Sequence, residues 1–131
     1  MTTKFESSFL YAQVDENDVI MVGFADDEFE TNDYVLFQKS SVSNEQDKKL
    51  GFDKVHITYC NQVHSTYGDI LKFVLKNGLA EITFDSRTAS ELSIDEKLEI
   101  VFPPNDAKLA EVKHYLAEMF IDKDGVFKSE A

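Results

Sequence analysis

The chain has 131 residues, with 25 acidic side chains against 13 lysines and arginines, and its formal net charge is −12. This length suits one domain with one hydrophobic core. The 43% of hydrophobic residues, including 11 Phe and 5 Tyr, exclude wholesale disorder. The negative charge argues against binding to nucleic acid or to anionic membranes, because both are polyanions. It favours a cationic partner, although the same charge also serves solubility.

Cys60 is the single cysteine, which excludes an internal disulfide framework and a zinc-finger cluster. The first residues lack the apolar segment of a secretory signal, and no stretch is long and apolar enough for a membrane-spanning helix. We therefore expect a cytoplasmic protein. We expect one domain over 1–131, with an ordered core at about 5–120 and a mobile tail at 121–131.

The first part of the chain predicts strands at 5–14, 19–25 and 34–38, which are rich in Phe, Tyr, Val and Ile. Residues 19–25 are apolar at every position, which is typical of a strand buried on both faces. The acidic segment 26–33 is either a loop or a strand edge. A short helix is expected at 45–50 and ends at Gly51.

Residues 54–60 alternate in polarity, which predicts a strand with one polar face. One side holds Val55, Ile57 and Tyr59, and the other holds Lys54, His56, Thr58 and Cys60.

The pair Asn77-Gly78 predicts a two-residue hairpin turn between strands at 70–76 and 79–85, because both residues tolerate positive φ. Such a turn fixes the register of the two strands. The expected apolar pairs are Leu75 with Ala80, Phe73 with Ile82 and Leu71 with Phe84. The other face then pairs Val74 with Glu81 and Lys72 with Thr83.

A short helix or turn follows at 86–93, and residues 96–102 predict a strand that ends at Pro103-Pro104. Asn105 or Asp106 is then expected to cap a helix at 107–120. The apolar residues of this helix form one stripe: Leu109, Val112, Leu116, Met119 and Phe120. The predicted fold class is α+β, a mainly antiparallel sheet of six or seven strands with the C-terminal amphipathic helix packed on one face.

Few residues indicate catalysis. His56, Cys60 and His64 are close in sequence and are candidates for a thiol–imidazole pair or a metal site. On a strand, however, His56 and Cys60 would lie roughly 13 Å apart, which is too far for a hydrogen bond. Phosphate-binding, zinc-protease, hydrolase and EF-hand motifs are absent from the sequence. We therefore predict no enzyme, no cofactor and no metal.

The acidic residues are unevenly placed. Residues 15–33 contain eight of them and no lysine or arginine. Two interpretations stay open at this stage, a solvated acidic rim and a docking face for a basic protein.

The order of several short motifs resembles the immunity protein 10 family, whose members occur beside bacterial polymorphic toxins. The motifs are Gly23-Phe24-Ala25-Asp26, Tyr34-Val35-Leu36-Phe37-Gln38, Glu45-Gln46-Asp47, Leu50-Gly51-x-Asp53, His56 and Gln62-x-x-Ser65-x-Tyr67-Gly68, with a C-terminal helix that ends in Phe120. The resemblance spans roughly residues 20–120. It implies a cytoplasmic protein without catalysis that binds a toxin domain and protects the producing cell.

One motif departs from the family pattern, since Asp69 stands where a second glycine is expected after Gly68. The motif residues also have a structural interpretation. Gly51 would end a helix, Tyr67-Gly68 would form a turn, and Gln38 and Asp47 would be buried polar groups.

These observations give two hypotheses of different classes. In the first, the chain inhibits a toxin domain with a basic surface, for which a nuclease is one candidate. The candidate contact residues are Asp26, Asp27, Glu28, Glu30 and Asp33, with Phe29 and Tyr34 as aromatic anchors, and a second candidate face holds His56, Gln62 and Ser65. The alternative is a small enzyme or ligand-binding domain at His56, Cys60 and His64. The sequence leaves the oligomeric state open.

Overall fold

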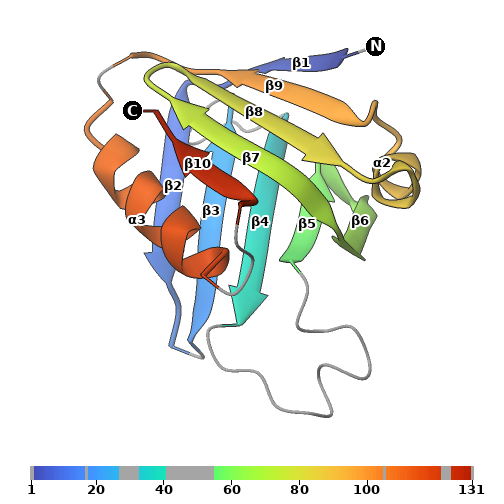
Figure 1. Cartoon of the computed structure of the whole chain (residues 1–131), viewed down its shortest axis with the longest axis horizontal. Coiled ribbons are helices and arrows are strands. Elements are labelled where there is room, and N and C mark those ends of the chain that lie inside the picture. The colour runs from blue at the N-terminus through green and yellow to red at the C-terminus, as the bar shows by residue number, and fades with distance from the viewer. Residues whose placement is uncertain are drawn as a thin grey trace.

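In the computed structural model of the chain, the structure describes residues 2–16, 18–26, 33–40, 55–104, 106–121 and 125–130. These residues form ten strands and two helices, and the strands make two five-stranded sheets that pack face to face (Figure 1). Sheet A has the order β1 (Thr2–Glu6), β9 (Lys97–Val101), β8 (Leu79–Phe84), β7 (Ile70–Lys76) and β10 (Phe127–Ser129). Sheet B has the order β2 (Phe9–Val14), β3 (Val19–Ala25), β4 (Tyr34–Ser40), β5 (Val55–Tyr59) and β6 (Asn61–Gly68). The expected helix at 45–50 lies outside the described residues.

The α+β class is confirmed, but the single sheet of six or seven strands is wrong. The predicted strand at 5–14 is in fact two strands, β1 and β2, which belong to different sheets. The backbone N–H of Ser7 donates to Val101 O of sheet A at 2.7 Å, and that of Ser8 donates to Ala25 O of sheet B at 2.9 Å. These two serines therefore carry the chain from one sheet to the other.

Two further strands have weak sequence signals. β6 is a polar edge strand beside β5, and β10 has three residues that pair in parallel with β7. The segment 121–131 therefore contributes a strand, β10. Parallel pairing between distant segments leaves little local signature, because neither strand needs a tight turn.

The core lies between the two sheets and consists mainly of Phe, Leu, Ile and Val from their inner faces. Phe24 and Phe37 of sheet B are buried, and so is Phe73 of sheet A. The ring centroids of Phe37 and Phe73 lie 5.4 Å apart across the two sheets, in an edge-to-face arrangement. Such aromatic pairs contribute beyond the area that they bury.

Helix α3 (Leu109–Met119) packs against β2, β3 and β10, so it covers part of the inner face of sheet B (Figure 1). The predicted stripe is confirmed, since Val112, Leu116, Met119 and Phe120 are buried and Leu109 packs against the core. The Lys39 ammonium group of β4 donates to Met119 O at 2.9 Å. It thereby binds a carbonyl group at the C-terminal end of the helix, where the helix dipole favours a cation.

In the hairpin of β7 and β8, four of the five pairs predicted from the turn are confirmed. The exception is Leu71, which was expected to face Phe84. A bulge between Ile70 and Lys72 places Ile70 opposite Phe84 instead, and Leu71 is 55% exposed. The bulge adds one residue to β7, so the apolar pattern of this strand shifts by one position there.

Helix α2 (Ser86–Leu92) begins after Asp85, whose carboxylate accepts the Thr88 N–H at 2.8 Å. It packs against β6. This edge of sheet B is thus covered by a helix, which protects it from pairing with other chains.

Candidate functional site

The outer faces of the two sheets differ in charge. On sheet A, side chains of both signs point outward and form ion pairs, among them Lys76 with Glu81 at 2.8 Å and Lys128 with Glu130 at 3.9 Å. The other charged residues of this face are Lys4, Glu6, Lys72, Lys97 and Glu99. A face of this kind is well solvated and has little tendency to bind another protein.

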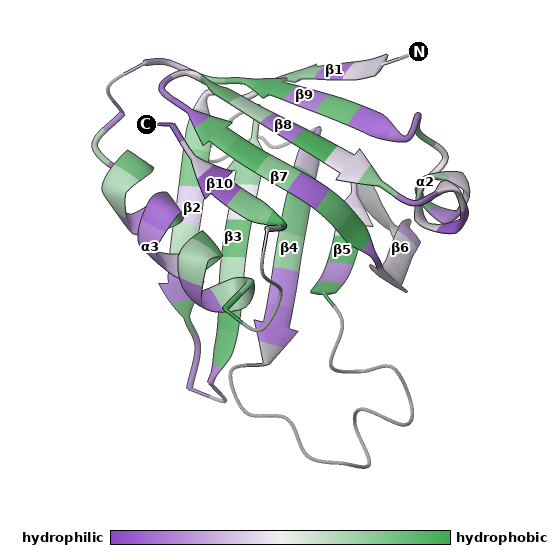
Figure 2. Ribbon diagram, viewed as in Figure 1, coloured by the Kyte–Doolittle hydropathy of each residue, from purple (hydrophilic) through white to green (hydrophobic). Residues whose placement is uncertain are grey.

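The outer face of sheet B has no charged side chain among the described residues of its strands. Strand alternation and register place the following residues on it: Phe9, Tyr11, Gln13, Met21, Gly23, Ala25, Tyr34, Leu36, Gln38, His56, Thr58, Ser65 and Tyr67. We call this set the sheet B outer face. In Figure 2, β3 has no hydrophilic residue along its length, whereas β7, β8 and β9 each carry hydrophilic residues among hydrophobic ones. Uncharged aromatic surfaces of this type are characteristic of the centre of protein interfaces.

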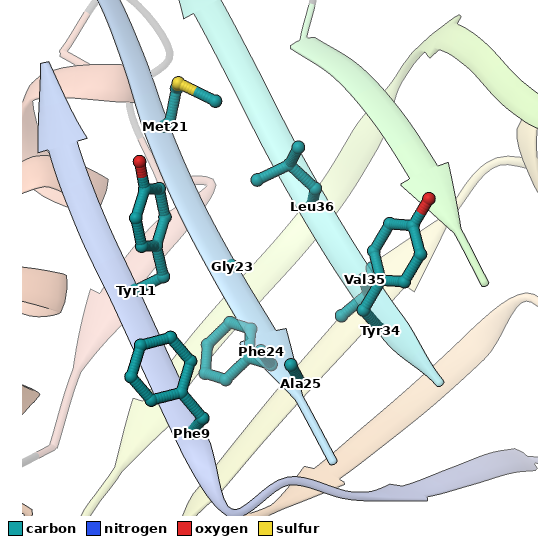
Figure 3. Close-up of a pocket in the computed structure, with 9 residues that line it drawn as sticks. All are labelled: Phe9, Tyr11, Met21, Gly23, Phe24, Ala25, Tyr34, Val35 and Leu36. Carbon is teal, nitrogen blue, oxygen red and sulfur yellow. The ribbon is translucent and has the colours of Figure 1, made fainter. Parts of the chain in front are cut away.

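A hollow of about 290 Å³ lies in this face, between β2, β3 and β4 (Figure 3). Its walls are formed by Phe9, Tyr11, Met21, Tyr34 and Leu36. Gly23 makes the floor, because it places no side chain there. A Cβ at this position would lie 3.3 Å from Leu36 Cδ1 and 3.7 Å from Tyr11 Cβ.

A second hollow, of about 420 Å³, adjoins the first and shares Tyr34 and Leu36 with it. Its other lining residues are polar: Gln38, His56, Thr58 and Ser65. His56 Nδ1 lies 3.4 Å from Gln38 Oε1, and its ring lies 4.9 Å from the ring of Tyr67. The imidazole is therefore held between an amide and an aromatic ring, and neither of these is charged.

Burial lowers the pKa of His56 below its ordinary value of 6.5, so the ring is neutral at neutral pH. Protons then bind the unfolded chain more tightly than the folded chain, and stability falls as the pH drops below about 6.5. We expect a His56→Gln variant to lose less stability than the wild type between pH 7.5 and pH 5.5, as measured by urea unfolding. Other titrating groups are common to both proteins. Equal losses would contradict this assignment.

Of the predicted acidic residues, the structure describes Asp26 and Asp33, which lie at one end of the sheet B strands. Asp26 follows β3 and Asp33 precedes β4, and the Asp26 N–H donates to Asp33 O at 3.0 Å. Asp15 and Asp18 lie in the turn at the other end, where Asp15 Oδ1 accepts the Val19 N–H at 2.9 Å. The remaining candidates, Asp27, Glu28, Phe29 and Glu30, lie outside the described residues.

One described residue of the first candidate face and two of the second lie on the same surface. Tyr34, the predicted anchor of the acidic segment, lines both hollows, and His56 and Ser65 line the polar hollow. The side chain of Gln62, the third residue of the second candidate face, lies outside the described part of the structure.

Sequence reasoning missed the apolar half of this surface, formed by Phe9, Tyr11, Met21 and Leu36. Residues 19–25 were predicted to be buried on both faces, and this is wrong, because Met21 and Ala25 are only half-buried and line an open hollow. The sequence feature that indicates an open face on this strand is Gly23, since a glycine inside an apolar strand often marks a place where another molecule approaches.

The described residues do not bring His56, Cys60 and His64 into one site. The Cys60 thiol donates to Asp33 Oδ1 at 3.6 Å, and burial raises its pKa, which disfavours the nucleophilic thiolate. Strand alternation puts His64 on the same side of β6 as Thr66, opposite to His56. Among the described residues, no group of three or more His, Cys, Asp or Glu side chains is placed to hold a metal ion.

The model of one protein family, immunity protein 10, matches residues 6–110 of the chain. The chain belongs to the immunity protein 10 family. The match confirms the resemblance seen in the sequence, and it covers all of sheet B with both hollows. No curated protein matches this immunity protein at significant similarity. Neither of its two described helices is long and apolar enough to cross a membrane.

The motif residues of this immunity protein do not all have the predicted structural roles. Gly68 ends β6 and pairs with Val55 rather than forming a turn. Asp69 donates its backbone N–H to Thr88 Oγ1 at 3.0 Å and has no positive φ, so no second glycine is needed there. Gln38 is half-buried in the polar hollow. Asp47 and Gly51 lie outside the described residues.

Proposed function

We propose that this immunity protein binds a cognate toxin domain through the sheet B outer face and neutralises it by docking, without catalysis. The observation that carries the proposal is the contrast between the two sheets. One outer face is covered with ion pairs, whereas the other is uncharged, rich in aromatic residues and hollowed. Desolvation of the apolar half of this face on binding is favourable, because no charged group there loses its water.

The toxin surface that fits this face is basic at its rim. Asp15 and Asp18 lie at one end of the sheet B outer face, and Asp26 and Asp33 lie at the other. Carboxylates at the rim of an interface mainly increase the association rate with a partner of opposite charge. A nuclease fits this description, because its own surface must be basic to hold nucleic acid.

Inhibition then follows from steric occlusion. A docked immunity protein covers the toxin's substrate-binding surface, and its own carboxylates occupy the place of the substrate's negative charge. Protection needs no reacting group in the immunity protein, which agrees with the separation of Cys60, His56 and His64.

The proposal predicts different effects from one added charge on each outer face. Met21→Glu places a carboxylate in the sheet B outer face, and Thr83→Glu adds the same charge to the outer face of sheet A. We expect Met21→Glu to weaken binding to the toxin domain of the neighbouring gene by at least about thirtyfold, the size of a hot-spot loss. Thr83→Glu should leave the dissociation constant unchanged. Isothermal titration calorimetry measures both values.

A co-expression assay with the active toxin tests protection in the same variants. Cells that produce the Met21→Glu protein should lose protection, while those with Thr83→Glu should keep it. If Thr83→Glu abolishes binding and Met21→Glu does not, sheet A is the docking face and the proposal is wrong.

A further inference from the structure

The Gly23 hollow, the apolar hollow with Gly23 at its floor, is too uniform to be a typical small-molecule site. Its volume of about 290 Å³ lies at the lower end of the usual range of such sites, roughly 300–1,000 Å³. Its walls are apolar, and it has no charged side chain among its lining residues that would orient a ligand. A group that enters it must therefore be positioned from outside the hollow, by a larger surface.

A water molecule would find few hydrogen-bond partners in this hollow. An ordered water needs two to four polar partners, and the floor at Gly23 and the walls of Phe9, Met21 and Leu36 present apolar atoms. Tyr11 and Tyr34 stand on opposite sides of Gly23 (Figure 3). An apolar side chain that enters between the two rings would displace weakly bound water and contact both of them.

The charged groups near the hollow determine which residues can lie beside that apolar side chain in the partner. Asp26 follows Ala25 and Asp33 precedes Tyr34, two residues that line the hollow, and no lysine or arginine lies among the described residues of the sheet B outer face. The neighbouring hollow adds acceptors, because His56 is neutral and Thr58 and Ser65 carry hydroxyl groups. Donor-rich, basic side chains next to the entering group are therefore favoured.

A second copy of this chain fits poorly. It would bring a second acidic chain against a protein that already carries a net charge of −12. Like charges that meet across an interface repel each other and oppose its formation.

We infer that the Gly23 hollow is an anchor pocket, which takes one large apolar side chain from a basic surface of the toxin domain. This inference rests on the proposed function and adds the chemistry of the contact. Gly23 is then the residue that determines specificity, because a side chain at this position would take up space in the pocket.

Filling the pocket from inside tests the inference. Gly23→Ala adds one methyl group against the end of the Leu36 side chain, and Gly23→Leu adds enough to occupy the pocket. We expect the dissociation constant for the toxin domain of the neighbouring gene to rise about tenfold for Gly23→Ala and about a hundredfold for Gly23→Leu. Thr83→Leu, which adds an apolar side chain to the outer face of sheet A, is the matched control and should leave it unchanged.

Thermal unfolding of each variant separates loss of binding from loss of folding. The backbone at Gly23 is an ordinary strand without positive φ, and the atom closest to an added Cβ is the end of the Leu36 side chain at 3.3 Å, which has to shift slightly. Gly23→Ala should therefore unfold close to the wild-type temperature. This variant keeps the test decisive even if Gly23→Leu fails to fold.

The outcomes distinguish the inference from the proposed function. If Met21→Glu abolishes binding while both Gly23 variants bind normally, the face docks but the pocket stays empty, and the inference is wrong. If Met21→Glu also binds normally, the proposed function itself fails. A wild-type dimer that Gly23→Leu dissociates in analytical ultracentrifugation would make a second copy the occupant and overturn the inference. The toxin domain should carry one exposed apolar residue beside a lysine or arginine. Its substitution by alanine should raise the dissociation constant as much as Gly23→Leu does.

Discussion

Phe73→Ala should lower the free energy of unfolding by about 3–5 kcal/mol, as measured by urea denaturation. Phe73 is fully buried in β7, and its ring contacts parts of the protein that are far apart in sequence. Its centroid lies 5.4 Å from that of Phe37 in sheet B, 6.0 Å from that of Phe120 after α3 and 6.1 Å from that of Phe127 in β10. Truncation would leave a cavity where the two sheets, the helix and the last strand meet.

Leu71→Ala is the matched control for this change. Leu71 belongs to the same strand, but the bulge in β7 leaves it 55% exposed. Its truncation should change the free energy of unfolding by about 0.5 kcal/mol or less. Equal effects of the two substitutions would show that Phe73 is not the packing centre that we describe.

Gly68→Ala should also be strongly destabilising, by about 1–3 kcal/mol, the usual range for overpacking of a core. A Cβ at this position would lie 2.4 Å from Thr88 Cγ2 and 2.8 Å from Thr88 Oγ1. Thr88 cannot easily move, because it is fully buried and its Oγ1 accepts the Asp69 N–H at 3.0 Å. Its own N–H is held by the Asp85 carboxylate at 2.8 Å.

A double-mutant cycle isolates this steric cause. Thr88→Ser removes Cγ2, the closest atom, and keeps the hydroxyl that binds Asp69. The Gly68→Ala/Thr88→Ser protein should therefore be more stable than the sum of the two single changes predicts, by about 0.5 kcal/mol or more. Gly23→Ala serves as the control, because the atom closest to its added methyl group is the end of the half-buried Leu36 side chain, at 3.3 Å. Additive effects in the cycle would contradict the proposed clash.

The sequence predicts local structure better than the assignment of strands to sheets. The Asn77-Gly78 turn fixes a register that four pairs confirm, because both strands lie within a few residues of the turn. Ser7 and Ser8, by contrast, carry no sequence signal for the crossing between sheets. Their hydrogen bonds to Val101 and Ala25 depend on segments that are distant in the chain. The same is true of β10, which pairs with β7 over a long separation.

Part of the candidate site can be predicted from the sequence, through its acidic residues and motif residues. Its apolar surface cannot. Tyr34, His56 and Ser65 were named from the sequence, and they line the two hollows. Met21 was missed because period-two alternation tells which residues share a face but not whether another layer covers that face. A strand that is apolar at every position gives the same pattern in a buried sheet and in a binding surface.

The strand order has a consequence for synthesis on the ribosome. Sheet B is built from the continuous segment 9–68 in sequence order, so each new strand pairs with the one made before it. Sheet A cannot be complete until the end of synthesis, because β1 comes first in the chain and β10, at Phe127–Ser129, comes last. Translation therefore completes the surface that we assign to toxin binding while the inner face of the same sheet still lacks its cover. Until the strands of sheet A and helix α3 emerge, any exposure of apolar surface during translation falls on the core side of sheet B.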